Sequence, residues 1–283
     1  MVAVAGLLFA AACSGGSHGG GSSSPRHGGV LRLAVTQLGS LDPATAATPE
    51  QQVVASALFQ TLTAYDPVSQ SIVPALAKSW RVSADQRQWD FTLRPGARFS
   101  SGGAVGTSDV LATFDRIAAK GSISPVAALL APITGFLAVN ATGASKHVSG
   151  ITVPVAGVVR ISVTHPLADL PDRLSSPDFG VVSVADAGPV GPSFADQPST
   201  SGPFIIKTRT ASSLTLVPAA GSPAYVGELR VDTLANSAAI YSAFVHGSVD
   251  WAVVPPAQLA DAARRFGRAG SGLWPPSCST AST

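Results

Sequence analysis

Residues 72–80 read IVPALAKSW, and residues 89–99 read WDFTLRPGARF. Proline suits the first turn of a helix, so the first stretch predicts a short helix over residues 74–79 that buries Leu76 and Trp80. In the second stretch, apolar and polar residues alternate, which indicates a strand with one buried face. The Arg-Pro-Gly that follows is typical of a turn, and it returns this strand to its sheet.

On both sides of these two stretches, apolar residues recur with the two-residue period of strands in some segments and with the 3.6-residue period of helices in others. Residues 30–36 have the two-residue period of a half-buried strand. Thr48 is a suitable N-cap for a helix, and residues 107–120 form a strongly amphipathic helix. Such a mixture with long connections predicts an α/β fold with a mixed sheet and α+β character. Further strands are expected at 80–82, 89–93, 151–153, 158–163, 201–207, 213–217, 229–234 and 250–254, and further helices at 237–244 and 258–266.

The composition excludes several classes of protein. Apolar residues make up 46% of the 283 residues, which is enough to build a core, while charged residues make up only 12%. The longest apolar run, residues 2–13, is shorter than a membrane-spanning helix. The net charge is +2 and the 18 basic residues are scattered, so the chain has no stripe that tracks phosphates. We therefore expect neither a multispanning membrane protein nor a nucleic-acid partner.

The N-terminal residues have the order of an export signal. Residues 1–13 are apolar, and three alanines precede Cys13, an arrangement similar to the lipobox of bacterial lipoproteins. Ala10 stands where that pattern prefers Leu, and no Lys or Arg comes earlier. Residues 14–29 are mostly Ser and Gly, which is typical of a flexible linker. We expect a signal peptide, lipidation at Cys13 and an exported protein anchored to the outer face of the cytoplasmic membrane; the alternative is a chance cysteine.

Eight short motifs follow each other along the chain: 28–32 (GGVLR), 41–43 (LDP), 58–62 (LFQTL), 72–80, 89–99, 107–110 (TSDV), 201–204 (SGPF) and 247–250 (GSVD). In this order they resemble the bacterial family 5 extracellular solute-binding proteins, the dipeptide and oligopeptide receptors of ABC importers. The resemblance covers about residues 28–266. It implies a type II periplasmic-binding-protein-like fold in which a monomer captures a peptide or related small solute between two lobes. It also implies delivery to an ABC permease and ATPase complex, with no cofactor.

The resemblance also implies ligand-binding residues. In the peptide receptors, the segment after the Leu-Asp-Pro turn pairs with the ligand backbone, as in β-strand addition. Here that segment contains Ala46, Ala47 and Thr48. Trp251, next to Asp250 near the lobe boundary, is a further expected contact. The alternatives are a plain loop for the first three residues and a core position for the tryptophan.

The length departs from the family pattern. Relatives have a second lobe of well over a hundred residues, whereas 33 residues follow Asp250, fewer than the ~50 of a small domain. We expect residues 30–266 to be the first lobe with the second lobe largely missing, residues 267–283 to be an irregular tail, and ligand binding to be weak or absent. The alternative function is a truncated surface lipoprotein, either a remnant or an interaction module, that takes no part in transport.

Motifs of catalysis and metal binding are missing from the sequence. It has no Gly-x-Ser-x-Gly elbow in an ordered region, no His-Glu-x-x-His and no phosphate-binding loop. His147, His165 and His246 have no clustered carboxylates or cysteines near them in the sequence. We therefore expect neither an enzyme nor a metal site.

Overall fold

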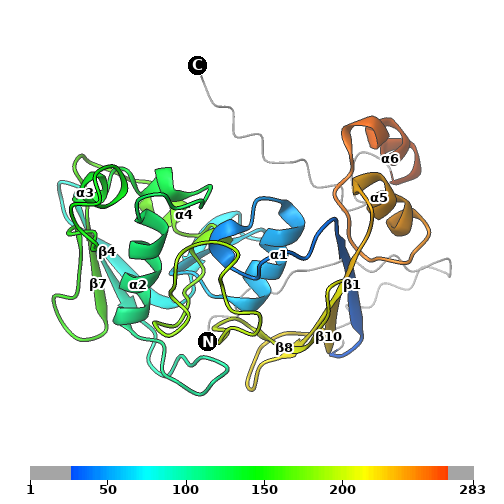
Figure 1. The fold of residues 1–283 in the computed structure, drawn as a ribbon, viewed down its shortest axis with the longest axis horizontal. Coiled ribbons are helices and arrows are strands. Elements are labelled where there is room, and N and C mark those ends of the chain that lie inside the picture. The colour runs from blue at the N-terminus through cyan, green and yellow to red at the C-terminus, as the bar shows by residue number, and fades with distance from the viewer. Residues whose placement is uncertain (1–26, 267–283) are drawn as a thin grey trace.

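The computed structural model describes residues 27–266, and it confirms the expected mixed α/β fold (Figure 1). The predicted signal peptide with Cys13, most of the predicted linker and the predicted tail at 267–283 lie outside the described residues. The strands are β1 (Val30–Val35), β2 (Thr63–Asp66), β3 (Ser71–Pro74), β4 (Ala77–Val82), β5 (Gln88–Leu93), β6 (Ile151–Thr152), β7 (Val158–Ser162), β8 (Phe204–Arg209), β9 (Ser213–Pro218) and β10 (Glu228–Thr233).

Helices and short 3-10 helices connect these strands. The α-helices are α1 (Pro49–Leu58), α2 (Thr107–Ala118), α3 (Phe136–Asn140), α4 (Leu170–Arg173), α5 (Ser237–Val245) and α6 (Leu259–Phe266). The 3-10 helices are η1 (Pro43–Thr45), η2 (Ala127–Leu130), η3 (Pro177–Phe179) and η4 (Pro256–Gln258). Between residues 27 and 266, no helix has both the length and the apolar character that crossing a membrane requires.

The first sheet joins the two ends of the described chain. Its strand order is β1-β10-β9-β8, and the β1–β10 pair is parallel while the others are antiparallel. Its core contains Leu33 from β1, Leu214 from β9 and Val231 from β10, and Leu58 of α1 packs against them. Strand β1 therefore depends on a partner almost two hundred residues away, and α1 is held over this sheet.

The second sheet is antiparallel throughout, with the order β4-β5-β7-β6. Helices α2 and α3 cover one of its faces (Figure 1). Phe91 of β5, Phe114 of α2 and Ile161 of β7 are fully buried between them. The Trp89 indole donates a hydrogen bond of 3.1 Å to the Leu167 carbonyl, which satisfies its one polar group inside the core. A two-stranded β2–β3 hairpin precedes this sheet in the chain.

The helix predicted over residues 74–79 is wrong, because β3 ends at Pro74 and β4 begins at Ala77. The N–H groups of Leu76 and Ala77 donate to the carbonyls of Thr61 and Leu62, at 3.0 and 2.9 Å. The Leu76 carbonyl accepts from Arg94 at 2.8 Å. Because these backbone groups pair with distant segments, they are not available for the hydrogen bonds of a helix. Leu76 is buried as expected, whereas Trp80 is only half-buried at the edge of the core.

The strand predicted over residues 250–254 is also wrong, because this stretch is irregular and mostly half-buried. Only its first residue meets the edge of β1: the Asp250 N–H donates to the Arg32 carbonyl at 2.8 Å, and its carboxylate accepts from the Arg32 N–H at 2.7 Å. Two prolines follow at positions 255 and 256, where the chain has no N–H to continue a ladder.

Candidate functional site

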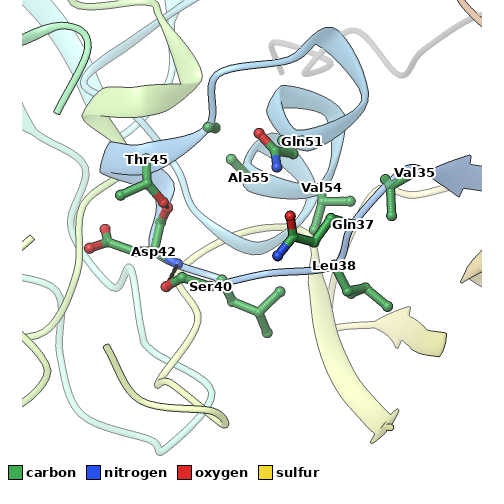
Figure 2. A pocket seen from close by; sticks show the side chains of 11 residues that line it. Val35, Gln37, Leu38, Ser40, Asp42, Thr45, Gln51, Val54 and Ala55 are labelled. Atoms are coloured by element: carbon green, nitrogen blue, oxygen red, sulfur yellow. Dashed lines mark hydrogen bonds between the residues drawn. The ribbon is translucent and has the colours of Figure 1, made fainter. Parts of the chain in front are cut away.

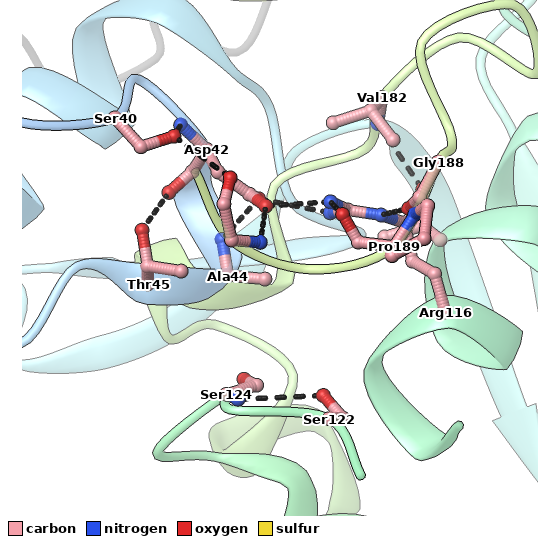
Figure 3. A network of polar contacts seen from close by, with 12 residues as sticks. Ser40, Asp42, Ala44, Thr45, Arg116, Ser122, Ser124, Val182, Gly188 and Pro189 are labelled. Atoms are coloured by element: carbon pink, nitrogen blue, oxygen red, sulfur yellow. Dashed lines mark hydrogen bonds and ion pairs between the residues drawn. The ribbon is translucent and has the colours of Figure 1, made fainter. Parts of the chain in front are cut away.

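A buried ion pair connects the segment after β1, a strand of the first sheet, with α2, which covers the second sheet. The Asp42 carboxylate lies in the turn before η1 and accepts two hydrogen bonds from the Arg116 guanidinium of α2, at 2.9 and 2.5 Å (Figure 3). Both side chains are almost completely buried, with exposed fractions of 0% and 3%. The same guanidinium donates to the Gly188 carbonyl at 2.8 Å and lies 5.3 Å from the centre of the Phe194 ring. Every part of this pair is therefore compensated by a polar or aromatic partner.

Arg116 belongs to a polar stripe along α2. Asp109, Thr113 and Arg116 follow each other at helical spacing, next to the apolar stripe. The Asp109 carboxylate accepts from the Val184 N–H at 2.9 Å, and the Thr113 hydroxyl accepts from the Val182 N–H at 3.1 Å. This stripe fixes the backbone from 182 to 188 between the two sheets.

The Asp42 carboxylate also shapes the segment that follows it. It accepts from the Ala44 N–H at 3.0 Å and from the Gly191 N–H at 3.1 Å. The Asp42 carbonyl accepts from the Thr45 hydroxyl at 2.9 Å. These bonds form η1 and hold the predicted ligand-binding segment in one conformation, because the turn is tied to α2 and to the 188–191 loop at once.

The N–H groups of the predicted ligand-binding residues are engaged within the chain. The Ala46 N–H donates to the Pro43 carbonyl at 3.1 Å, and the Ala47 and Thr48 N–H groups donate to the Gln51 side-chain carbonyl at 3.0 and 3.2 Å. The Thr48 hydroxyl in turn accepts from the Gln51 N–H, which completes a capping box at the start of α1. Within residues 27–266, the carbonyls of Ala46 and Ala47 accept no hydrogen bond. The segment therefore presents acceptors rather than donors.

An open recess lies beside this segment, between α1 and the stretch that follows β1 (Figure 2). It is shallow: the space that a water-sized sphere can enter is about 20 Å³, and the rest is open to solvent. Gln37 and Gln51 come from its two sides, and Ser40 and Thr45 add hydroxyls. The lining residues are Val35, Gln37, Leu38, Ser40, Leu41, Asp42, Thr45, Ala46, Gln51, Val54 and Ala55. Because the one charged side chain among them is paired with Arg116, the recess suits an uncharged group.

The structure brings three of the four predicted contacts together. Ala46 lines the recess and is buried, Ala47 is exposed beside it, and Thr48 caps α1. Trp251 is not among the residues that line the recess. It is half-buried in the irregular stretch after Asp250 and packs against the core of the first sheet.

Asp178 is a further buried carboxyl near this region. It lies in η3, which packs against η1 and α1, and its side chain is completely buried. One oxygen accepts from the Ser176 hydroxyl at 2.7 Å and from the Gln52 amide at 3.4 Å, while the other has no partner among the described residues. Burial raises the pKa of Asp178, since the charged form is costly in an apolar environment.

Sequence reasoning missed Arg116, Asp109 and Asp178 as parts of this region. For the first two, a usable signal exists: polar residues at 109, 113 and 116 share one helix face and border the apolar stripe. A cation at the edge of a buried face requires an anion, although the sequence does not show that the partner is Asp42. For Asp178, no local pattern distinguishes a buried carboxyl from a solvated one.

Comparisons with known proteins agree with this architecture. The Periplasmic murein peptide-binding protein MppA of Escherichia coli K12 is 35% identical over 141 residues, which cover 49% of this chain and 26% of MppA. The Probable D,D-dipeptide-binding periplasmic protein DdpA of the same strain is 25% identical over 242 residues, 80% of this chain and 43% of DdpA. The solved structure of OppA from Burkholderia pseudomallei matches with a TM-score of 0.74 at 18% identity, over 87% of this chain and 49% of OppA.

This chain thus spans about half the length of the solved structures it matches. MppA and DdpA are both named as binding proteins. The family model for bacterial extracellular solute-binding proteins, family 5 Middle, matches residues 71–269, well over half of the chain. The chain therefore belongs to family 5 of the bacterial extracellular solute-binding proteins.

Proposed function

We propose that this chain captures peptides, or related small solutes, as the substrate-binding component of an ABC importer, and performs no chemistry. The observation that carries this proposal is the rigid segment 46–48 beside an uncharged recess. Its conformation is fixed before any ligand arrives, so binding costs little ordering of the chain. The names of MppA and DdpA describe peptide-binding and dipeptide-binding proteins, which supports a peptide as the ligand.

The proposed contact is a partial form of strand addition. The carbonyls of Ala46 and Ala47 accept N–H groups from an extended peptide, which lies over the recess. The Gln51 side chain already accepts hydrogen bonds from the N–H groups of Ala47 and Thr48. The carbonyls of the ligand therefore need other donors, or the Gln51 side chain has to rotate away and free these two N–H groups. Trp251 is proposed as a second contact, with its half-buried ring turned toward ligand on binding. Delivery to a permease and ATPase complex completes the proposed role.

A bulky residue at the exposed position 47 is expected to block this contact. We expect Ala47→Trp to weaken peptide binding at least about tenfold, which is about 1.4 kcal/mol, because the indole covers the two acceptor carbonyls. The measurement is calorimetric titration of the full chain with di- to pentapeptides. Ala141→Trp, at an exposed position after α3, is the matched control and is expected to bind as the parent does.

Two results of that titration decide the proposal. Peptide binding that survives Ala47→Trp unchanged places the site elsewhere and contradicts the role of residues 46–48. Absence of binding by the parent chain to every peptide tested contradicts peptide capture by this chain and favours the alternative of a surface lipoprotein outside transport.

We further propose that the protein is exported and anchored through lipid at Cys13. The support is the run of small residues before this cysteine and the periplasmic location stated in the names of relatives. We expect Cys13→Ser to abolish incorporation of radiolabelled palmitate and to release the protein from the membrane fraction. Cys278→Ser is the matched control and is expected to leave both unchanged. Palmitate incorporation that survives Cys13→Ser contradicts the proposal.

A further inference from the structure

The second sheet has an uncovered polar face, opposite the face that α2 and α3 cover (Figure 1). The strand register brings Arg81 of β4, Asp90 of β5 and Arg160 of β7 into one row across the sheet. Ser79 and Thr92 are directly paired in the neighbouring row. Side chains two apart along a strand share a face, so all five lie on the same side of the sheet.

This face has more positively charged than negatively charged side chains. On the four strands the only charged residues are Lys78, Arg81, Asp90 and Arg160, three cations and one anion. Asp90 already accepts two hydrogen bonds from the Arg160 guanidinium, at 2.6 and 2.7 Å, which lowers the pKa of its carboxyl. Lys78 and Arg81 are exposed, and neither forms an ion pair with any residue between 27 and 266. The face therefore has two cations without an internal anion.

These side chains surround a hollow rather than a flat surface. The space that a water-sized sphere can enter is about 420 Å³, and it is open to solvent. The lining residues are Lys78, Ser79, Arg81, Asp90, Thr92 and Val158. The hydroxyls of Ser79 and Thr92 add short hydrogen-bonding groups to its floor.

We propose that this face docks an acidic segment of a partner protein. Carboxylates of such a segment pair with Lys78 and Arg81, and the hydroxyls hydrogen-bond to its backbone or side chains. An anionic membrane attracts surfaces with clusters of cations. This face is concave and has the Asp90 carboxylate at its centre, so it fits a narrow protein segment better than a flat membrane. The proposed peptide-capture residues 46–48 belong to a different part of the fold, so this docking does not depend on them.

Binding at this face is expected to be weak and sensitive to salt. Exposed ion pairs add little individually, and salt screens them over about 10 Å at 0.1 M. The diagnostic result is therefore an affinity that changes with the charge of the peptide and with ionic strength, and a high affinity is not expected.

The test is fluorescence anisotropy of the full chain with a labelled glutamate-rich peptide whose termini are blocked. We expect binding that weakens as salt rises, and a glutamine-rich peptide of equal length that does not bind. The double variant Lys78→Gln with Arg81→Gln is expected to bind at least about threefold more weakly. Lys120→Gln with Lys146→Gln removes the same charge from two exposed lysines away from this face and is the matched control. Ala47→Trp is expected to bind the acidic peptide normally, which separates this face from the peptide-capture site.

Three results would overturn the proposal. The first is an acidic peptide that does not bind at low salt. The second is an equal loss in the two double variants, which indicates net charge alone. The third is binding to vesicles of phosphatidylglycerol and phosphatidylcholine in the absence of any binding to the peptide, which assigns the face to a membrane.

Discussion

An Arg116→Met variant is expected to lose about 3–5 kcal/mol of unfolding free energy, because it leaves the Asp42 carboxylate buried without its cation. The substitution also removes the hydrogen bond to the Gly188 carbonyl and the contact of the guanidinium with the Phe194 ring. Since α2, the turn before η1 and the 188–191 loop all meet at this guanidinium, the variant is expected to loosen the segment that presents residues 46–48. Urea unfolding followed by circular dichroism measures the change.

The matched control is the exposed pair of Asp90 and Arg160, whose side chains are 34% and 36% exposed. Arg160→Met is expected to cost about 0–1 kcal/mol, because solvent screens this pair. The double variant Asp42→Leu with Arg116→Met is expected to recover part of the loss, since it removes the stranded charge. Equal small losses of unfolding free energy in Arg116→Met and Arg160→Met would contradict the claim that the buried pair of Asp42 and Arg116 stabilises this fold.

A Gly202→Ala variant is expected to lose about 3 kcal/mol, at the upper end of the range for overpacking. A Cβ atom at this position lies 2.5 Å from the Ala57 carbonyl oxygen and 2.7 Å from the Phe59 nitrogen, both backbone atoms. The Gly202 N–H also donates to the Leu58 carbonyl at 2.8 Å. The Ser-Gly-Pro-Phe motif therefore contains glycine because β8 begins in direct contact with the end of α1.

Gly103→Ala is the control for this prediction. A Cβ atom there meets nothing closer than the Ser101 hydroxyl at 3.8 Å, so the expected change is within about 0.5 kcal/mol. Thermal unfolding of the two variants distinguishes them. A Gly202→Ala protein as stable as the parent would mean that α1 and β8 separate readily, which contradicts the close approach.

The parts of the fold that the sequence predicts are those with local signals. The helix that begins after Thr48 has a cap, a proline and a glutamine at the right spacing, and the structure shows the complete capping box. Strands are also predicted at 201–207 and 213–217, and the structure has β8 and β9 there, with β8 displaced toward the C-terminus. The helix predicted at 74–79 is wrong because hydrogen bonds to the carbonyls of Thr61 and Leu62, which belong to another segment, decide its conformation.

The candidate site is predictable only in part, for the same reason. The Leu-Asp-Pro turn marks the segment, but Asp42 and Arg116 are 74 positions apart in the chain, and no local pattern pairs them. The sequence interpretation also left the backbone N–H groups of this segment free for a ligand, and the structure corrects it: the N–H groups of Ala47 and Thr48 donate to the Gln51 side chain within the capping box. The expected ligand contact therefore changes from full strand pairing to acceptance by carbonyls.

The most direct test of peptide capture is backbone amide NMR of the full chain titrated with an extended, uncharged tripeptide such as blocked trialanine. We predict that the largest chemical-shift changes occur at Ala46, Ala47, Thr48 and the Gln51 side-chain amide, with a smaller change at the Trp251 indole. Changes confined to other parts of the fold, or none at high peptide concentration, would contradict the account.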